Sequence, residues 1–299
     1  MSPPLDVICL GEALVDFLPD RRGRLRDCER FEVHSGGAPA NVAVGLARLG
    51  VRTGFVGVVG EDEFGHLLER KLRAEGIELS LRFSPDARTG AWFVALDEHG
   101  DRTFFTPTGA ESADKLIDRR DILRIEPSTW LHCGSSAHIR QDAQEALKVA
   151  VRLRRRISFD PNVRLHLWRD PRELRALCAD VFPHCDVVKL SEDELEPCLG
   201  VRTPEAALDA LRDVPLICVT LGERGVLARR GKETLHVPAP RVEVVDTTGA
   251  GDGFVAGLLA SAPLEGDLGS ALTMACAVGS RVCTRLGAVA GLPTRADLS

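Results

Sequence analysis

A small-residue turn that carries a carboxylate stands at residues 246–254, DTTGAGDGF. Gly249, Ala250 and Gly251 allow the backbone to turn tightly with its N–H groups pointing one way, and an apolar helical pattern follows them. Unpaired amides at a helix N-terminus bind anions, and Asp252 in the first turn places a base beside them. The same residues equally suit an ordinary Asp/Thr helix cap with a glycine turn.

A second junction between a loop and a helix lies at residues 35–50, SGGAPANVAVGLARLG. Gly36 and Gly37 interrupt the chain, and the spacing of the apolar residues after them predicts a helix that ends at Gly50. Asp16 stands earlier, just after the first strand-like run, VICLG. The two junctions are therefore the places where small residues, amides and carboxylates gather.

Strand and helix patterns alternate along the segments that must position these junctions. Strand-like runs such as TGFVGVVG, TWLHC, ISFDPN, DVVKLS and LICVTL are separated by amphipathic segments such as DEFGHLLERKLRAEG and IRQDAQEALKVAVRLRRR. This alternation predicts an α/β fold with a central, mostly parallel sheet flanked by helices. Sites are then expected at the carboxyl ends of the strands.

The pattern changes between residues 79 and 107, where AWFVALDEHGDRTFFTP has two apolar runs around a hairpin-length turn, DEHG. We predict a small antiparallel β unit there. No internal repeat or low-complexity linker occurs, so we expect residues 1–299 to form a single domain. Inserted β segments at 13–34 and 79–107 would form its small additional sheet.

The composition excludes several classes of protein. A formal net charge of −6, with 44% hydrophobic and 27% charged residues, suits a globular protein and argues against a nucleic-acid partner. The basic run RLRRR precedes an apolar strand and is interpreted as a solvated helix end. Nine cysteines without a CxxC pair predict buried, reduced thiols and a cytoplasmic protein. No run approaches the ~18 apolar residues of a membrane span, and the first residues lack a secretory pattern.

The sequence lacks the motifs of several other classes of enzyme and binding site. No GxGxxG follows the first strand, which removes the usual dinucleotide fingerprint. Gly225 and Gly231 enclose five residues, and Lys232 is followed by Glu233, so a Walker phosphate loop is absent. Neither GxSxG nor a close metal-ligand spacing of His and Cys occurs. Phosphate binding would therefore have to come from the GAGD turn.

Together, SGGAPANVAVGLARLG and DTTGAGDGFVAGLLA resemble the two signature segments of the PfkB family of sugar kinases, also called ribokinase-like kinases. The resemblance continues through VICLGEALVDF, FDPNVRLHLW, VVKLSEDE, VTLGERGVLA and TRLGAVAGLPT. Within the family, DPNVR followed by LxLW is most similar to fructokinases, those of bacteria in particular. The resemblance implies a nucleotide-binding α/β core whose small β sheet forms a lid over the sugar.

The resemblance also implies roles for the two junctions. Asp252 matches the catalytic base for the sugar's primary hydroxyl, and Gly249, Ala250 and Gly251 match the anion hole for the transferring phosphoryl group. Phosphoryl transfer needs mainly positioning and charge stabilisation, so a base, a ring of amides and Mg²⁺ suffice. The residues implied to bind the sugar are Asp16, Gly36, Gly37, Asn41 and Arg164. Without the resemblance, these residues also suit a turn, a glycine break, a helix cap and a solvated arginine.

For the cofactors, the resemblance implies a segment near the ATP phosphates and Mg²⁺ and another on the adenosine side. The implied residues are Lys189, Ser191, Glu194, Thr220, Gly222, Gly225 and Cys276. SEDE is also a capping-box pattern, and Ser191 and Cys276 stand where many relatives carry asparagine. Asp246 and Thr248 fall in the region that binds K⁺ in some members.

We therefore expect an ATP-dependent fructokinase that forms fructose 6-phosphate. The alternatives within the class are 2-keto-3-deoxygluconate kinase, which commonly uses lid tyrosines that this chain lacks, and a kinase for another sugar or a nucleoside. A sugar-binding regulator without catalysis is the alternative from another class, although it has no chemical need for Asp252. Phe93, Arg102 and Phe104 are candidate lid residues for sugar selection, and an exposed lid edge predicts a homodimer.

Overall fold

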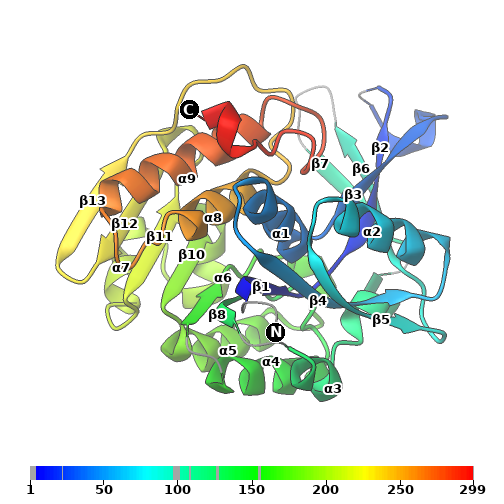
Figure 1. The fold of residues 1–299 in the computed structure, drawn as a ribbon, viewed down its shortest axis with the longest axis horizontal. Helices are drawn as coiled ribbons and strands as arrows, with labels where there is room; N and C mark the ends of the chain where they lie inside the picture. The colour runs from blue at the N-terminus through cyan, green and yellow to red at the C-terminus, as the bar shows by residue number, and fades with distance from the viewer. Residues whose placement is uncertain are drawn as a thin grey trace.

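The computed structural model describes residues 5–21, 23–96, 102–107, 109–125, 128–153 and 156–298. Within them, strands form one large and one small sheet, and helices lie on both faces of the large sheet (Figure 1). The α/β architecture predicted from the alternating patterns is confirmed.

The large sheet has nine strands in the described residues, in the order β13-β12-β11-β10-β9-β8-β1-β4-β5. Its strands are β1 (Leu5–Leu10), β4 (Thr53–Gly60), β5 (Glu78–Ser84), β8 (Ser128–Cys133), β9 (Arg156–Phe159), β10 (Val187–Ser191), β11 (Leu216–Thr220), β12 (Val226–Arg230) and β13 (Glu233–Val237). The pairs from β5 to β11 are parallel, and β12 and β13 pair antiparallel at the other edge. The parallel strands are apolar along their length because helices cover both faces.

Two hydrophobic cores lie on opposite faces of this sheet. One core is built with α1, α2, α8 and α9, and the other with α4, α5, α6 and α7. In Figure 1, α1, α8 and α9 lie over the upper face and α3, α4 and α5 over the lower one. The helices are α1 (Ala38–Arg48), α2 (Glu63–Ala74), α3 (Arg119–Leu123), α4 (Gln141–Leu153), α5 (Pro171–Val181), α6 (Leu195–Leu199), α7 (Pro204–Ala210), α8 (Ala250–Ala260) and α9 (Leu268–Val282).

Short polar side chains fix where several helices begin. Asp62, Asp170 and Asp267 each accept hydrogen bonds from first-turn amides of α2, α5 and α9, which satisfies donors that have no partner inside the helix. Short 3-10 helices complete the connections: η1 (Leu25–Asp27), η2 (Gly109–Glu111), η3 (Ala113–Lys115), η4 (Leu165–Leu167), η5 (Phe182–His184), η6 (Glu192–Glu194), η7 (Gly222–Arg224) and η8 (Arg295–Leu298).

The small sheet, which we call the lid, has the order β3-β2-β6-β7 in the described residues. Its strands are β2 (Leu14–Pro19), β3 (Phe31–Gly36), β6 (Gly90–Leu96) and β7 (Arg102–Phe105). The predicted antiparallel pair is present as β6 and β7, but β2 and β6 run parallel. The expected turn DEHG lies outside the described residues.

The segment predicted for the lid at 79–107 is too long at its start. Residues 79–84 belong to β5, which pairs in parallel with β4 at the edge of the large sheet, and the lid strand begins at Gly90. The alternating pattern of a strand does not reveal which sheet the strand joins, because side chains alternate in the same way in both sheets. Partner strands decide that assignment.

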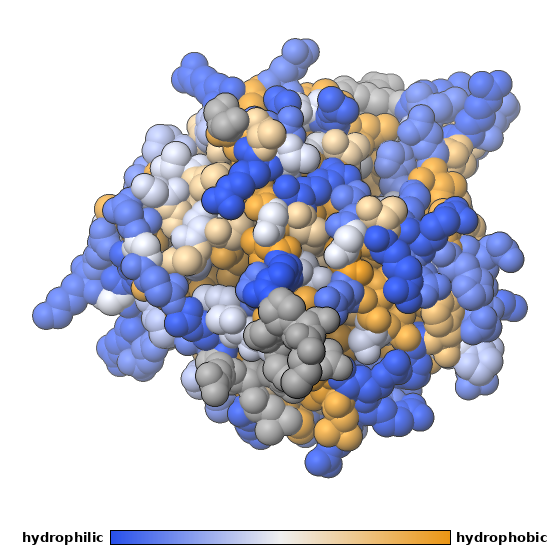
Figure 2. Space-filling view, in the orientation of Figure 1, coloured by the Kyte–Doolittle hydropathy of each residue, from blue (hydrophilic) through white to orange (hydrophobic). Residues whose placement is uncertain are grey.

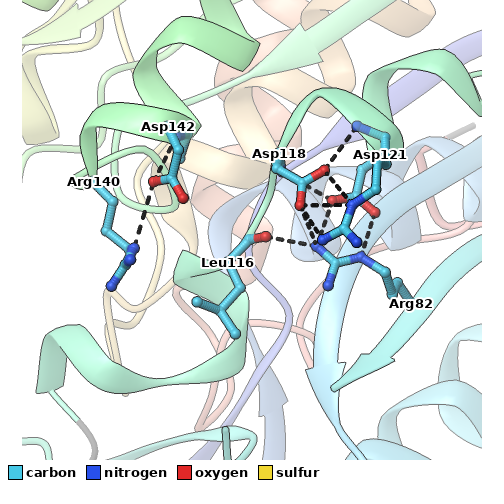
Figure 3. Close-up of polar contacts among 8 residues, drawn as sticks. Arg82, Leu116, Asp118, Asp121, Arg140 and Asp142 are labelled. Atoms are coloured by element: carbon cyan, nitrogen blue, oxygen red, sulfur yellow. Dashed lines mark hydrogen bonds and ion pairs between the residues drawn. The ribbon is translucent and has the colours of Figure 1, made fainter. Parts of the chain in front are cut away.

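Arg82 of β5 fastens this edge of the sheet to α3. Its guanidinium contacts Asp121 at 2.7 and 2.8 Å and donates to the Leu116 carbonyl at 2.6 Å, and Asp118 lies 3.5 Å away (Figure 3). The hydrogen bonds that Arg82 donates to Asp121 are the largest cause of a pKa of Arg82 above its usual value. Bidentate pairs of this kind hold two elements in a fixed orientation.

Strands β1, β4, β8, β9, β10 and β11 are parallel, so their carboxyl ends all lie at the same end of the large sheet. The chain enters the lid from the carboxyl end of β1 and returns to the large sheet through α1. No helix in the described part of the chain is long and apolar enough to cross a membrane.

Candidate active site

The GAGD turn begins α8, as its small residues predict. Gly249 adopts φ 78° as the residue before the helix, and a side chain there would lie 2.6 Å from the Cβ of Ala288. Only glycine takes this left-handed conformation without strain. The amides of Gly251 and Asp252 fall in the first helical turn, whereas that of Ala250 donates to the Thr247 carbonyl at 3.3 Å.

Helix α8 packs closely against its neighbours because it carries small residues. A Cβ on Gly253 or Gly257 would lie within 3 Å of α9, and Gly45 of α1 faces Ala256 just as closely. Close packing brings the start of α1 against the start of α8, although the two helices are far apart in sequence. The two junctions identified in the sequence are thereby joined in space.

Asn41 and Asp252 meet directly at this contact. The Asn41 side-chain amide donates to Asp252 Oδ2 at 2.8 Å, and both side chains are buried. Burial raises the pKa of Asp252 above its usual value, while the hydrogen bond from Asn41 and the positive charges of Lys189 and Arg164 act in the opposite direction. A hydrogen-bonded carboxylate with a raised pKa is a suitable proton acceptor.

Asp16 and the glycine pair occupy the junction between the lid and the large sheet. A Cβ on Gly36 would lie 2.2 Å from Asp16 Oδ2, so glycine at this position leaves the space that the Asp16 carboxylate occupies. Gly37 has φ 102°, and a Cβ there would lie 2.3 Å from the Glu12 carbonyl. These glycines therefore let β2 and α1 approach each other at the entrance to the lid.

Glu12 is a buried carboxyl group that the sequence interpretation passed over. Its Oε1 accepts from the Ala38 amide at the start of α1 at 3.2 Å. Its Oε2 is buried without a hydrogen-bond partner in the described structure. Burial raises the pKa of Glu12 to about 7, although Lys115 nearby lowers it. The signal in the sequence was an acidic residue immediately after a buried strand, in VICLGE.

A buried charge cluster lies beneath the GAGD turn. Lys189 Nζ lies 3.1 Å from Asp160 Oδ2 and 3.9 Å from Glu194 Oε2, and a Cβ on Gly251 would lie 3.0 Å from the same nitrogen. Burial raises the pKa of Asp160 to about 7, against the effect of Lys189. Burial alone would lower the pKa of Lys189, but the carboxylates outweigh it and raise that pKa. Asp160 was not among the predicted site residues.

Glu194 ties two loops to this cluster. Its Oε2 accepts from the Ser191 amide at 2.8 Å, as the SEDE capping pattern predicts, and its Oε1 accepts from the Val163 amide at 2.7 Å. The second bond fixes the DPNVR loop, where Arg164 stands next to Val163. The positive charge of Arg164 lowers the pKa of Asp252. The capping interpretation and a role in the site are therefore compatible for Glu194.

Of the residues predicted for the adenosine side, Thr220 lies at the end of β11 next to this cluster. Thr220 is paired with Ser191 across β11 and β10, and its hydroxyl donates to the Leu190 carbonyl at 3.3 Å. The loop after β11 has Gly222 at φ 60° and Gly225 at φ 92°. Cys276 of α9 is only 6% exposed. Burial raises the pKa of Cys276 to about 11, so its thiol is protonated and offers only a weak hydrogen bond.

Asp246 and Thr248 form a compact turn before the GAGD segment. Asp246 Oδ1 accepts from the Thr248 amide at 3.0 Å and from its hydroxyl at 2.7 Å, and Oδ2 accepts from the Gly287 amide at 2.8 Å. A cavity between the lid and this turn is lined by Leu18, Pro19, Asp20, Arg21, Val94, Val245, Asp246 and Leu286. Across the described residues, no three His, Cys, Asp or Glu side chains form a group that could hold a metal ion by themselves.

The geometry thus joins Asp252, Asn41, Gly251 and Lys189 at one point, while Asp16 lies over Gly36 at the lid junction. The lid residue Phe93 stacks on Phe17 with ring centroids 4.6 Å apart. Arg102 and Phe104 lie in β7, but their side chains are outside the described part of the structure. A buried base, first-turn amides and an ammonium group together can bind an anion and accept a proton beside it.

The chain matches the profile of the pfkB family carbohydrate kinases over residues 5–295. A fructokinase from Klebsiella pneumoniae is 40% identical over 97% of this chain and 96% of its own length. A solved double-mutant fructokinase from Vibrio cholerae O395, in a fructose, ADP and potassium ion bound form, has a TM-score of 0.88 at 35% identity and covers 100% and 98% of the two chains. A fructokinase with bound ATP from Xylella fastidiosa has a TM-score of 0.87 at 30% identity, over 98% and 96%.

Proposed function

The chain belongs to the pfkB family of carbohydrate kinases, and on that premise we propose that it is an ATP-dependent fructokinase that forms fructose 6-phosphate. Near full-length similarity to fructokinases, including one bound to fructose and ADP, supports this substrate. The observation that carries the mechanism is the hydrogen bond of 2.8 Å between Asn41 and Asp252, which sets a buried base at the amide turn. We propose that residues 1–299 form a single kinase domain that includes the lid.

Asp252 acts as the general base in this proposal. It accepts the proton of the primary hydroxyl of fructose as the hydroxyl oxygen bonds to the γ-phosphorus of ATP. The bond from the γ-phosphorus to the bridging oxygen breaks, and ADP leaves with that electron pair. The raised pKa of Asp252 brings its basicity closer to neutral pH, which favours this proton transfer.

The GAGD turn stabilises the transferring phosphoryl group. Gly249 sets the direction of the turn, and the amides of Gly251 and Asp252 in the first helical turn supply donors together with the positive end of the α8 dipole. Ala250 can join them once its amide exchanges the Thr247 carbonyl for the phosphoryl oxygen. Fixed donors of this kind require little reorganisation as charge develops.

Fructose lies between the lid and the large sheet in the proposal. Asp16 and Asn41 offer a carboxylate and an amide to its hydroxyl groups, and Gly36 and Gly37 leave room for the ring beside their backbone. Arg164 reaches the sugar or the phosphate from the DPNVR loop. Hydroxyl groups held by a few directed donors and acceptors give the selectivity that apolar contacts alone do not.

ATP binds with its phosphates near Lys189, Ser191 and Glu194 and its adenosine along Thr220, Gly222, Gly225 and Cys276. Mg²⁺ commonly takes one or two carboxylates together with phosphate oxygens and water, so the carboxylate of Glu194 fits this ion without a dedicated protein cage. The ion would neutralise negative charge on the phosphates when bound. Potassium is proposed at the turn of Asp246 and Thr248, in line with the potassium-bound fructokinase of Vibrio cholerae O395.

We also propose a homodimer formed through the lid. Phe17, Val33, Phe93 and Phe105 face one another across its strands, and Val33 and Phe105 remain 40% and 57% exposed. Figure 2 shows apolar surface on the same side of the molecule as the lid and α2. An exposed apolar sheet with open edges gains by pairing with a second copy. Light scattering that finds only monomers at micromolar concentration would contradict this assembly.

None of the nine cysteines, all of which lie in the described residues, forms a disulfide, which supports action in a reducing compartment, and we propose the cytoplasm. We propose no contact with nucleic acid or membrane, in keeping with the net charge of −6.

The purified chain with Mg·ATP and a panel of sugars and nucleosides tests the proposed activity. We expect the highest kcat/KM with fructose and a product phosphorylated at its primary hydroxyl. A higher value with 2-keto-3-deoxygluconate, ribose or a nucleoside would transfer the assignment to that acceptor. Calorimetric binding of fructose without any ADP production would instead favour a sugar-binding regulator.

A further inference from the structure

Asp160 has no role in the mechanism described so far, although its partner Lys189 lies at the proposed phosphate site. Asp160 follows β9, and Lys189 lies in the adjacent parallel strand β10, where Val188 pairs with Phe159. The Lys189 ammonium donates to Asp160 Oδ1 at 3.3 Å and lies 3.1 Å from Oδ2. Both side chains are less than one-tenth exposed, so this is a buried ion pair.

The ammonium group lies against the GAGD turn. A Cβ on Gly251 would stand 3.0 Å from Lys189 Nζ and 3.7 Å from Cε, so glycine at this position leaves space that the lysine uses. The positive charge is therefore next to the amides that the proposed mechanism assigns to the phosphoryl group. In a buried site, such a charge acts strongly on a nearby phosphate.

A lysine side chain does not hold such a position by itself. It has a flexible four-carbon stem and a point-like charge, and several rotamers are open to it unless a partner fixes the ammonium. Among the described residues, Asp160 is its closest carboxylate partner at 3.1 Å, since Glu194 lies 3.9 Å away. Asp160 thus determines where the Lys189 charge stands.

We propose that Asp160 is a positioning residue for phosphoryl transfer, which holds the Lys189 ammonium against Gly251 so that its charge faces the transferred phosphoryl group. The inference rests on the proposed kinase function of the same site. Asp160 does not touch the sugar or the nucleotide in this arrangement and acts only through Lys189.

A purely structural role for Asp160 predicts different behaviour. Asp160 Oδ1 also accepts from the Asn162 amide at 3.2 Å and shapes the DPNVR turn, where Asn162 has φ 45°. Asp160→Asn keeps an acceptor oxygen for that amide and removes only the negative charge. The substitution therefore separates the shape of the turn from the fixation of Lys189.

A double-mutant cycle tests the inference with Asp160→Asn, Lys189→Met and the two together. We expect each single substitution to lower kcat by about tenfold or more, with the KM for sugar within about twofold of the wild type. The double variant should be no slower than Lys189→Met within about twofold, because Asp160 has nothing to position once the ammonium is gone. Multiplicative losses in the double variant would overturn the inference, as would an unchanged kcat in Asp160→Asn.

A matched control and a second readout keep the result interpretable. Asp180→Asn removes a carboxylate from another Asp–Lys pair, 2.8 Å from Lys148 on the surface, and should leave kcat unchanged. Binding of a non-hydrolysable ATP analogue with Mg²⁺, measured by calorimetry without sugar, should weaken in Asp160→Asn and show the same non-additivity. If analogue binding shows this non-additivity across the variants but the wild type phosphorylates no sugar, the proposed function fails while the positioning of Lys189 by Asp160 stands. If sugar is phosphorylated and the cycle is additive, only the positioning role fails.

Discussion

Two ion-pair clusters of this molecule, one partly buried around Arg82 and one buried around Lys189, each join a basic side chain to carboxylates and differ in how completely they are paired. Arg82 directs two nitrogens at Asp121, with contacts of 2.7 and 2.8 Å, and a further bond at the Leu116 carbonyl (Figure 3). Lys189 instead shares a single ammonium among carboxylates, with Asp160 at 3.1 Å and Glu194 at 3.9 Å. The negative charge of Asp252 also raises the pKa of Lys189.

The difference separates a cluster that holds elements together from one that handles charge. Around Arg82, the planar guanidinium group pairs with carboxylates of opposite charge. The pKa of the arginine is raised chiefly by its hydrogen bonds to Asp121. Around Lys189, negative charge exceeds positive charge, and burial raises the pKa values of Asp160 and Asp252. Perturbed carboxyl groups of this kind gather at functional sites, because excess charge can be compensated by a proton, a metal ion or a substrate.

The largest expected effect is on the chemistry of the second cluster. Replacing Asp252 by Asn removes the base while keeping its shape and its place beside Asn41. Turnover should fall at least ~100-fold with folding intact, since general-base catalysis commonly contributes that much. A steady-state assay with fructose and ATP measures the loss, and a thermal melt checks the fold.

Asp267→Asn is a matched control, because Asp267 also stands at the start of a helix, where it accepts from the Ser270 amide at 2.7 Å. It lies at the start of α9, away from the GAGD turn, and should keep normal turnover. Near-normal turnover in Asp252→Asn would remove the general-base mechanism altogether.

The next effect breaks the first cluster. Arg82→Ala leaves the carboxyl group of Asp121, which is 2% exposed, without its charged partner, and we expect a loss of about 2–4 kcal/mol in the free energy of unfolding. Activity per folded molecule should stay unchanged, because Arg82 lies at the outer strand β5. Urea denaturation followed by an activity assay measures both quantities.

Arg120→Ala provides the comparison for this variant, because Arg120 pairs with Asp118 at 2.6 Å but is exposed. Its midpoint of denaturation should stay close to that of the wild type. A lower kcat for fully folded Arg82→Ala would show that the two clusters are coupled. It would contradict a purely structural role for the Arg82 cluster.

The smallest effect concerns Glu12, whose pKa is raised to about 7 chiefly by burial. Since the pKa of glutamate in the unfolded chain is about 4.3, the stability associated with protonated Glu12 is fully present below that pH and is lost as pH rises through about 7. The wild type should thus lose stability between about pH 5 and pH 8, and Glu12→Gln should lose at least about 1 kcal/mol less. Urea midpoints at the two pH values measure this difference.

Glu145→Gln is a suitable reference, since Glu145 is exposed on α4 and pairs with Lys148 at 3.1 Å. It should follow the wild-type pH dependence. If Glu12→Gln instead showed the same pH dependence of stability as the wild type, Glu12 would be ionised in the folded protein throughout this range. Its charge would then be compensated in the fold, as the charges around Arg82 are.

Much of the candidate site could be predicted from local sequence. The residue types from Gly249 to Asp252 favour a tight turn followed by a first helical turn, because glycine permits the left-handed conformation that Gly249 adopts before α8. Gly36 and Gly37 mark the second junction for the same reason. Alternating apolar patterns likewise predicted the α/β class, since each strand and helix carries its own period.

Asp160 and Glu12 show the limit of this local reading. Each is a single acidic residue after a buried strand, and neither its burial nor its partner can be read from neighbouring residues. The place of β5 in the large sheet also escaped prediction, because strand pairing depends on distant segments.

The sequence by itself determined the local conformations and the chemical groups: the glycine turns, the helix starts, the strands, and a carboxylate beside a row of amides. Only the tertiary structure decided which groups meet. Close packing of small residues brings α1 to α8 and joins Asn41 to Asp252 at 2.8 Å, and neighbouring parallel strands set Asp160 beside Lys189. Burial then raises the pKa values of these carboxyl groups, because desolvation is a property of the packed interior and not of any segment alone.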